Sequence, residues 1–482
     1  MMHKLTKIIT TIGPSSDSDE MIEKMLHMGV NVIRFNFKHN VVQWHDEKIG
    51  KVKEIALRLK KTVGILLDLQ GPEIRIRMPE EDMTLEKGEI ITLGEKALKE
   101  EVKGFSISHP QMLSYLVIGQ QLIADDGAFS FEVVEIQPDI KLKSLNKGLL
   151  SNRKSLRVPR AVFPLPILIK RDYEGLDLVK RHQIDFVALS YVRKPEDIIY
   201  LKNEILKRKL QTKIVAKIET QSALSHLDSI IKESDILMIA RGDLGIEMPI
   251  EQVPYWQKVI IGKCLEHAKP VITATQMLQS MTNNPYPTRA EVSDVANATY
   301  DLTDAVMLSG ESAFGTYPLQ TIEMMNKTVI SNETKFVSDT RLRYLFTTEG
   351  NEGLICESAY NLYLALHKRK EEVDGFIVFT RSGKTVHLLS RYRPAIPIFA
   401  FAGDERVSNG LSLTFGTYSF VHGEFSSKEQ VSRDEIVKSA HRVCNFLGKK
   451  SGLFIIMFGD YWLIEGGTST VKLLSYSTSL VK

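Results

Sequence analysis

The stretch KIVAKIETQSALSHLDSIIKESDILMIARGDLG, residues 213–245, decides the fold of this chain. Its two short apolar runs, Ile214–Lys217 and Ile236–Ala240, have the length of buried strands. The segment between them, Ser222–Glu233, has the spacing of an amphipathic helix. A strand, a helix and a second strand in this order predict a βαβ unit, and both strands end next to charged residues.

The same alternation continues on both sides of this unit. Helical patterns cover Gln43–Lys60, Pro195–Lys209, Glu251–His267 and Arg289–Tyr300, with capping residues at some of the expected starts. The eight predicted strands are Lys7–Ile12, Val30–Asn36, Val63–Asp68, Phe186–Ser190, Ile214–Lys217, Ile236–Ala240, Val271–Ala274 and Ala305–Leu308. Eight such units predict an α/β fold with a (β/α)8 TIM barrel, although the pattern alone leaves a doubly wound sheet open.

Two regions depart from this rhythm, as expected for 482 residues, too many for one core. Between about Gly71 and Phe163, β-like runs such as Ile90–Leu93, Gln121–Ala124 and Phe129–Ile136 predict an inserted β-barrel domain. Beyond Asn332, the predicted strands Gly375–Thr380, Ile396–Ala400 and Gly452–Met457 alternate with helices Glu352–His367 and Glu429–Leu447. We therefore expect the barrel in 1–70 and 164–333, the insertion in 71–163 and a C-terminal α/β domain in 334–482.

The composition argues against several classes of protein. A net charge of +3 is too small to indicate a nucleic-acid-binding protein, and no apolar run is long enough to span a membrane. The three cysteines, Cys264, Cys356 and Cys444, are widely spaced and suit a reducing compartment. The N-terminal segment reads as a strand and not as a signal peptide, so we expect a cytoplasmic protein.

Charged and polar residues gather where the predicted barrel strands end, the usual place of active sites in this fold. Glu219 and Asp243 follow adjacent strands and could share one hard cation, Mg²⁺ or Mn²⁺. Lys217 and Arg34 would add positive charge, as phosphoryl transfer requires. The remaining residues of this kind are Asn36, Asp68, Arg241, Thr275, Ser309 and Glu311, and the backbone amides of 242–245 could hold an anion. The spacing alone indicates a metal-dependent enzyme that acts on anionic substrates.

The order of motifs resembles that of the pyruvate kinase family along nearly the whole chain. The motifs are TKIITTIGPSS (6–16), GVNVIRFNFKHN (29–40), LDLQGPEIR (67–75), KIET (217–220), IARGDLGIEMP (239–249), ITATQMLQSM (272–281), PTRAEVSDVANA (287–298) and MLSGESAFGTYP (307–318). The resemblance implies a barrel, an inserted lid, a C-terminal α/β domain and a homotetramer. It also implies the glycolytic transfer of a phosphoryl group from phosphoenolpyruvate to ADP, giving pyruvate and ATP.

The resemblance also implies roles for individual residues. Lys217 would neutralise the phosphoryl group, Glu219 and Asp243 would bind the metal, and the amides at Gly242 and Asp243 would hold the substrate carboxylate. Thr275 would lie beside the substrate methylene, and Ser309 and Glu311 would belong to the proton relay. Arg34 would contact the phosphoryl group. The residues that the resemblance assigns to the nucleotide and the lid are Arg75, His39, Asp126 and Lys154, although His39 also reads as a structural residue.

The monovalent-cation site departs from the family pattern. In the family, a K⁺ ion is held by Asn36, a serine, Asp68 and the carbonyl at Leu69, and in this chain Lys38 replaces the serine. We expect the ammonium of Lys38 to lie against Asp68 and Asn36, so that K⁺ is not required. The alternative is that Lys38 points to solvent.

The lid and the C-terminal domain carry further departures and signals. Arg157 and Arg160 replace an asparagine and a glycine at the end of the lid, and Gln70 replaces a lysine. These changes favour one alternative, a catalytically weak paralogue that binds phosphoenolpyruvate or a sugar phosphate as a regulator. A second alternative, a related barrel lyase, also stays open. The loop with Thr380, Ser382, Gly383, Lys384 and Thr385 resembles a sugar-phosphate effector site, or is a tight turn.

Overall fold

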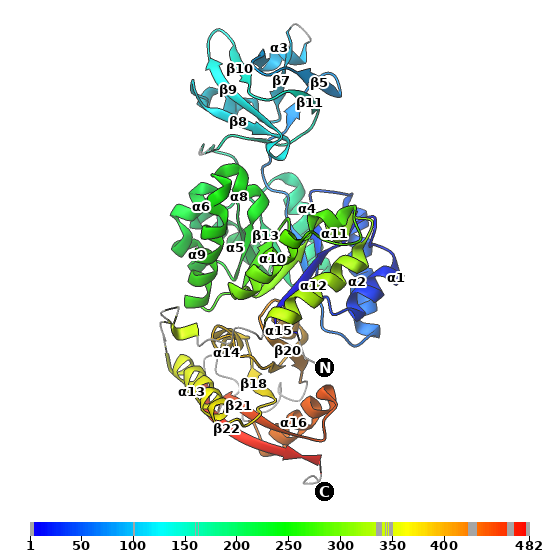
Figure 1. The fold of residues 1–482 in the computed structure, drawn as a ribbon, viewed down its shortest axis with the longest axis vertical. Coiled ribbons are helices and arrows are strands. Elements are labelled where there is room, and N and C mark those ends of the chain that lie inside the picture. Colours follow the sequence, from blue (N-terminus) through cyan, green and yellow to red (C-terminus); the bar gives the residue numbers. More distant parts are fainter. Residues whose placement is uncertain are drawn as a thin grey trace.

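The computed structural model describes residues 4–99, 102–159, 161, 163–333, 340–342, 344, 346, 350–422, 431–459 and 467–478. Three bodies follow one another along the longest axis, with a β domain at one end, a barrel in the middle and an α/β domain at the other end (Figure 1). Arg160 and residues 429–430 of one predicted helix lie outside the described residues. No helix in the described ranges is long and apolar enough to cross a membrane.

The central body is a closed barrel of parallel strands, which confirms the predicted (β/α)8 fold and excludes the doubly wound sheet. Its strands, in their order around the barrel, are β1 (Lys7–Thr11), β17 (Ala305–Leu308), β16 (Val271–Ala274), β15 (Ile236–Ala240), β14 (Lys213–Ile218), β13 (Phe186–Leu189), β3 (Gly64–Asp68) and β2 (Val32–Asn36). The register pairs Asn36 with Asp68 and Lys217 with Met238, so these neighbouring strands end at similar levels at one rim of the barrel.

Helices surround the barrel, and one of the predicted helices differs from the structure. They are α1 (Asp19–His27), α2 (Val42–Arg58), α4 (Lys170–His182), α5 (Pro195–Lys207), α6 (Gln221–Ser225), α7 (Leu227–Glu233), α8 (Arg241–Glu247), α9 (Val253–Glu266), α10 (Arg289–Tyr300), α11 (Gly310–Ala313) and α12 (Pro318–Asn332). The single helix predicted over 222–233 is wrong, because the backbone at His226 leaves helical geometry and divides it into α6 and α7.

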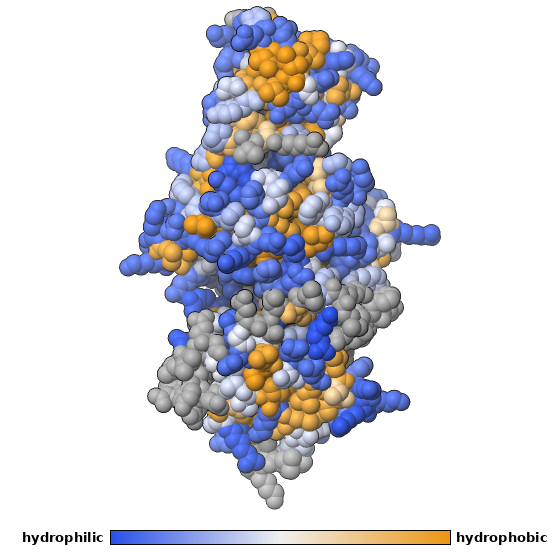
Figure 2. All heavy atoms as spheres, turned by 90° about the vertical axis from the view of Figure 1, so that its left-hand side faces the viewer, coloured by the Kyte–Doolittle hydropathy of each residue, from blue (hydrophilic) through white to orange (hydrophobic). Residues whose placement is uncertain are grey.

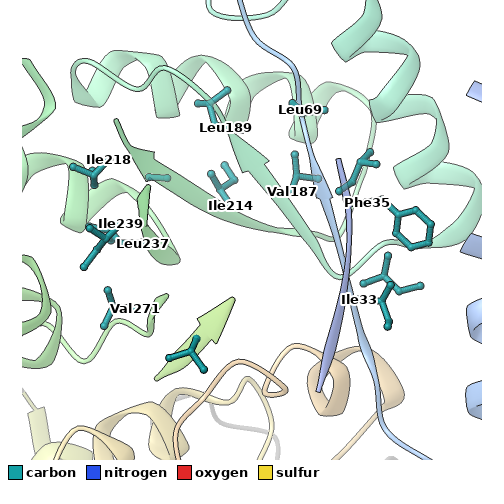
Figure 3. Close-up of a cluster of buried hydrophobic side chains, with 14 of the residues drawn as sticks. Ile33, Phe35, Leu69, Val187, Leu189, Ile214, Ile218, Leu237, Ile239 and Val271 are labelled. Atoms are coloured by element: carbon teal, nitrogen blue, oxygen red, sulfur yellow. The ribbon is translucent and has the colours of Figure 1, made fainter. Parts of the chain in front are cut away.

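Two layers of apolar side chains hold the barrel together. Alternate strand residues such as Val32, Leu66 and Val215 fill its interior. The opposite strand faces, including Ile33 and Val187, pack outward against the helices (Figure 3). Both layers are buried, so the strand ends form a rigid rim on which side chains keep fixed positions.

The inserted β domain leaves the barrel after β3 and returns before α4. Its larger sheet has the order β12 (Leu156–Arg157), β8 (Gln121–Ala124), β9 (Phe129–Glu135), β10 (Ile140–Ser144), β6 (Ile90–Leu93), β7 (Gly104–Ile107) and β4 (Ile76–Arg77). A second sheet pairs β11 (Gly148–Ser151) with β5 (Asp82–Leu85), and the short helices are α3 (Glu95–Leu98), η1 (Pro110–Tyr115) and η2 (Asp125–Gly127). The surface of this domain carries an apolar patch, whereas the barrel below it is mainly hydrophilic (Figure 2).

The C-terminal domain packs against the amino end of the barrel, away from the rim. Its sheet has the order β20 (Thr417–Val421), β19 (Ile398–Ala402), β18 (Gly375–Thr380), β21 (Ser451–Gly459) and an antiparallel β22 (Thr468–Ser477), with helices α13 (Gly350–Lys368), α14 (Lys384–Ser390), α15 (Glu405–Asn409) and α16 (Arg433–Leu447). The 3-10 turns η3 (Ile250–Gln252), η4 (Gln279–Thr282) and η5 (Thr340–Leu342) complete the described elements. Lys7, at the start of β1, donates a 2.5 Å hydrogen bond to the carbonyl of Thr417. The domain boundaries themselves stay predictions.

Candidate active site

The ammonium of Lys217 is the centre of the polar network at the barrel rim. It lies 3.2 Å from a carboxylate oxygen of Asp68 and 2.8 Å from one of Glu219, and donates a 2.9 Å hydrogen bond to Ser190 Oγ. The strands β14, β3 and β13 are neighbours, so strand register alone brings these groups together. The carboxylates of Asp68 and Glu219 are only 1% and 2% exposed, so their charges are balanced by the lysine and not by water.

Arg34 joins the same network from β2. Its guanidinium donates to Asp68 Oδ2 at 2.8 Å and 2.7 Å, and to Thr11 Oγ1 at 2.8 Å. Asp68 therefore accepts from two cations, one on each carboxylate oxygen. The fork geometry fixes the arginine with its charge at the rim.

The pKa shifts follow from this arrangement. Burial alone would lower the pKa of Lys217, but the carboxylates of Asp68 and Glu219 outweigh it and raise that pKa. Burial alone would raise the pKa of Asp68, but the positive charges of Lys217 and Arg34 outweigh burial and lower that pKa. The rim thus keeps an ammonium and a carboxylate ionised in a buried place, where charges act most strongly.

Glu219 and Asp243 form the candidate metal site. Glu219 also accepts a 2.8 Å hydrogen bond from the backbone N–H of Tyr191. Burial raises the pKa of Glu219, and the nearby carboxylate of Asp243 raises it further. Two carboxylates that repel each other fit a hard dication, which takes its other ligands from water and substrate oxygens. No group of three or more His, Cys, Asp or Glu side chains that could hold a metal occurs in the described parts of the chain.

The segment after β15 meets the segment after β16 at Thr275. The backbone N–H of Gly242 donates to Thr275 Oγ1 at 2.8 Å, and that hydroxyl donates to the carbonyl of Ala274 at 2.7 Å. Thr275 has a φ of 68°, a conformation that a β-branched residue rarely adopts. Arg241 stabilises this turn from behind, donating to the carbonyl of Thr275 at 2.8 Å and pairing with Asp294 at 2.7 Å. The hydroxyl of Thr275, a residue with a strained backbone, therefore lies at the start of α8, beside the candidate metal site.

Ser309 and Glu311 lie at the end of β17. The carboxylate of Glu311 is buried and accepts from the backbone N–H groups of Ser309 at 2.7 Å and Leu278 at 3.3 Å. Its contacts fix two loops of the rim. The hydroxyl of Ser309 is buried and has no hydrogen-bond partner among the residues that the structure describes, which leaves it available to a substrate or water.

The residues assigned to the lid contact neighbouring residues of the same inserted domain. Lys154 pairs with Asp125 at 2.8 Å, and Asp126 accepts a 3.0 Å hydrogen bond from Ser155. Arg75 donates to the carbonyl of Arg153 at 2.6 Å. Elsewhere, burial lowers the pKa of His39, and its backbone carbonyl accepts a hydrogen bond of 2.8 Å from the His45 ring.

The loop after β18 lies in the C-terminal domain, on the other side of the barrel from the rim (Figure 1). Gly383 has a φ of +89° and donates its N–H to Thr380 Oγ1 at 2.9 Å. Lys384 pairs with the carboxylate of Glu352, and the hydroxyl of Thr385 lies 2.7 Å from that of Thr468. Ser382 lies in the same turn, between β18 and α14.

Comparisons with known proteins agree with this geometry. Residues 3–322 match the model of the pyruvate kinase barrel domain, and residues 357–474 match that of the pyruvate kinase alpha/beta domain. The chain belongs to the pyruvate kinase family. A pyruvate kinase of Staphylococcus epidermidis is 38% identical over 475 residues, covering 96% of this chain and 78% of that protein. One of Staphylococcus aureus is 36% identical over 476 residues, with the same coverage.

A solved structure extends the likeness to three dimensions. A pyruvate kinase from Cryptosporidium parvum superposes with a TM-score of 0.88 at 31% identity, covering 98% of this chain and 96% of that one. The resemblance and the fold predicted from the motifs are therefore confirmed. Pyruvate kinases are phosphotransferases and generally use Mg²⁺.

The structure corrects the prediction for Lys38. Its ammonium pairs with Glu73 at 2.7 Å, and only its backbone N–H reaches Asn36, at 3.3 Å. The expected contact with Asp68 is wrong, because Arg34 and Lys217 already take both oxygens of that buried carboxylate. The reading that Lys38 merely points to solvent does not fit either, since Glu73 is 4% exposed and holds it.

Sequence reasoning missed some residues that shape this pyruvate kinase site. Ser190, which binds Lys217 and donates to the carbonyl of Leu69 at 2.8 Å, follows β13 and could have been found by the same strand-end rule. Asp172 accepts from the N–H groups of Gln70 at 2.9 Å and Gly71, and so fixes the loop after β3. Asp172 lies in the first turn of α4, and nothing in the sequence pattern of that helix distinguished it from a surface carboxylate. Glu73 was quoted within a motif but given no role.

Proposed function

We propose that this chain catalyses the pyruvate kinase reaction, transferring the phosphoryl group of phosphoenolpyruvate to ADP and protonating the enolate that remains. The observation that carries the proposal is the placement of the Lys217 ammonium between Asp68 and Glu219. Such a fixed, desolvated cation stabilises charge on a transferring phosphoryl group without reorganisation during the reaction.

The other rim residues have complementary parts in the proposal. Arg34 holds the phosphoryl oxygens from the side opposite Lys217. Thr275, with Ser309 and the buried Glu311, orders the groups that deliver a proton to the substrate methylene. The amides at the start of α8 face the substrate carboxylate once the N–H of Gly242 exchanges its bond to Thr275.

Glu219 and Asp243 would hold the divalent cation, Mg²⁺ or Mn²⁺. When bound, that cation supplies charge neutralisation for the phosphoryl and carboxylate oxygens of the substrate. The raised pKa of Glu219, caused by burial and by Asp243, supports this assignment because a cation relieves both costs.

A coupled assay with lactate dehydrogenase tests the reaction directly. Pyruvate formation from phosphoenolpyruvate and ADP, dependent on Mg²⁺, is the expected result. One observation favours a second function, a regulator that binds substrate without turnover: the lid residue Arg157 contacts Asp243. Binding of phosphoenolpyruvate without turnover of any nucleoside diphosphate would establish the regulator and refute the enzyme.

We also propose that activity does not require K⁺. Side-chain cations already balance the carboxylates of this region, since Asp68 accepts from Arg34 and Lys217, and Glu73 lies 2.7 Å from both Lys38 and Arg75. In buffer free of Na⁺ and K⁺, full activity is expected, with less than a twofold gain on adding K⁺. Lys38→Ser restores the family residue and is expected to make activity depend on K⁺. Strong activation of the unmodified protein by K⁺ would contradict this.

The proposal also covers an effector site, the assembly and the cellular location. The turn at Thr380–Thr385, with Lys384 at its end, is proposed to bind an anionic sugar-phosphate effector once Lys384 leaves Glu352. The expected assembly is a homotetramer, which sedimentation measures. A cytoplasmic location agrees with the three cysteines, all free and buried.

A further inference from the structure

The first turn of α4 holds the loop after β2 through one arginine. Arg171, the second residue of α4, donates to the carbonyl of Phe37 at 2.6 Å and to that of His39 at 3.2 Å, and it also bonds the carbonyl of Asn40. Its guanidinium lies 4.7 Å from the centre of the Phe37 ring, within the range of a cation–π contact. A cation in the first turn does not stabilise its own helix, because the positive end of the helix dipole repels it. The bonds to the loop therefore account for the position of Arg171.

The next residue, Asp172, holds the loop after β3 with the opposite charge. Its carboxylate is fully buried and accepts from the backbone N–H groups of Gln70 at 2.9 Å and Gly71 at 3.2 Å. It also accepts from the N–H of Ile169 at 2.9 Å, so the start of α4 and the loop share one carboxylate. Burial raises the pKa of Asp172 against the lowering effect of these N–H groups. A buried carboxylate is costly unless it is hydrogen-bonded, so the aspartate and the loop amides depend on each other.

Packing one turn further along α4 brings the helix against the same two loops. Gly175 leaves room for Leu69 of one loop and Phe37 of the other, both of which are buried. A Cβ atom at position 175 would lie 3.0 Å from Leu69 Cδ2 and 3.1 Å from Phe37 Cε1. Glycine is the residue that permits such a close approach of the backbone. The helix therefore contacts both loops through its backbone as well as through two charged side chains.

The two loops carry groups that the proposed reaction uses. Lys38, after β2, pairs with Glu73, after β3, at 2.7 Å, so this ion pair joins one loop to the other. The carbonyl of Leu69 accepts a 2.8 Å hydrogen bond from Ser190 Oγ, and that hydroxyl accepts from Lys217 at 2.9 Å. Contacts with α4 on one hand and these bonds on the other thus fix the loops at several points.

We propose that Arg171 and Asp172 are positioning residues, which fix the loops after β2 and β3 and so set the geometry of the Lys38–Glu73 pair and of the hydroxyl that supports Lys217. The inference rests on the proposed function, in which this region needs no K⁺. An ion pair that is fixed in advance loses no conformational freedom when the substrate binds. Removing the contacts with α4 therefore lowers turnover without removing any group that meets the substrate.

A double-mutant cycle in buffer free of Na⁺ and K⁺ tests this positioning role. Arg171→Met and Lys38→Met are each expected to lower kcat for pyruvate formation about tenfold, with KM for phosphoenolpyruvate changed by less than about threefold. Because Arg171 acts through the loop that carries Lys38, the double variant should lie within about twofold of either single variant. A loss of about a hundredfold, the product of two independent effects, would refute the inference.

Two further variants separate positioning from a general loss of charge or packing. Arg171→Lys keeps a donor for the loop carbonyls and is expected to recover part of the turnover that Arg171→Met loses. Arg208→Met is the matched control, because Arg208 is also half-buried, pairs with Asp177 at 2.6 Å and lies 5.6 Å from the ring of Tyr173. Its kcat should equal that of the unmodified protein. A loss in Arg208→Met as large as in Arg171→Met would contradict a specific role for the loop contacts.

Hydrogen exchange measures the loop after β3 without any need for turnover. Asp172→Asn keeps the size of the side chain but places an amide N–H₂ group against backbone donors. The amides of Gln70 and Gly71 should then exchange about tenfold faster or more, whereas those of β17 should exchange as before. Unchanged exchange at Gln70 and Gly71 would refute the role of Asp172. If the unmodified protein forms no pyruvate, the proposed function is wrong, and the exchange rates still decide whether α4 fixes this loop.

Discussion

The rim of the barrel and the lid above it place their charges in different ways. At the rim, Lys217, Asp68 and Arg34 come from separate strands and each has at least two polar partners within 3.2 Å. In the lid, Arg157 reaches the site alone, from a two-residue strand next to a cavity. The rim side chains are each held by several partners in fixed geometry, whereas the lid side chain contacts the rim through one ion pair across the domain boundary. This difference shows which charges the barrel positions by strand register and which depend on how two domains pack.

The largest expected effect comes from removing the central cation of the rim. Lys217→Met is expected to lower kcat for phosphoryl transfer by about 10³ or more, because one preorganised charge on the transferring group is lost. Metal-dependent enolisation of pyruvate, measured by exchange of its methyl protons in deuterated water, should remain detectable because it needs no phosphoryl transfer.

Lys232→Met, on the exposed face of α7, is the control for this substitution and should keep normal activity. Substantial phosphoryl transfer by Lys217→Met would show that the role given to this lysine is wrong. Loss of both reactions together would indicate that the site around Asp68 and Glu219 has collapsed. A thermal unfolding temperature equal to that of the unmodified protein would exclude such a collapse.

A smaller effect tests whether the rim depends on its hydroxyl support. Ser190→Ala removes the acceptor 2.9 Å from Lys217 while leaving both carboxylates in place. We expect kcat to fall about tenfold, ~1.4 kcal/mol, with KM for phosphoenolpyruvate changed less. Ser229→Ala, at a half-buried serine whose hydroxyl donates to the carbonyl of His226, is the matched control. A rise in KM at constant kcat would assign Ser190 to ground-state binding instead.

The rim was the part most open to prediction from sequence. Strand length and spacing placed Lys217, Glu219 and Asp243 at one end of parallel strands, and the register of neighbouring strands brings these ends to the same rim. The same logic failed for Lys38, because it lies past the end of β2, where strand register no longer sets direction. There the choice of partner depended on Asp68 being already taken and on Glu73 approaching from the next loop.

The lid was harder to predict for a physical reason. Arg157 was visible as an unusual residue, but its partner lies 86 positions away in another domain. No periodicity connects the two, since the approach depends on the packing of η2 against α8. The division of one predicted helix at His226 and the role of Asp172 are of the same kind, set by tertiary contacts and not by local pattern.

The last prediction concerns folding stability and not catalysis, at the start of α2, which follows the loop that carries Lys38. His45 is fully buried, and its Nε2 lies 2.8 Å from the carbonyl of His39. Its Nδ1 has no hydrogen-bond partner in the described part of the chain. Burial lowers the pKa of His45 from 6.5 to about 4. Above pH 6.5 the ring is neutral in both the folded and the unfolded chain, so it adds no pH dependence there.

As the pH falls from 6.5 towards 4, the unfolded chain takes up a proton that the folded chain refuses, so the free energy of unfolding decreases by up to about 3 kcal/mol. His45→Gln keeps a donor for the carbonyl of His39 and should remove this part of the acid sensitivity. Urea unfolding at pH 7.5 and pH 4.5 measures it as a smaller drop in midpoint than in the unmodified protein. His267→Gln, an exposed histidine, should leave the drop unchanged. An equal drop in His45→Gln would mean that carboxylates of the rim, and not this buried ring, set the acid limit of the fold.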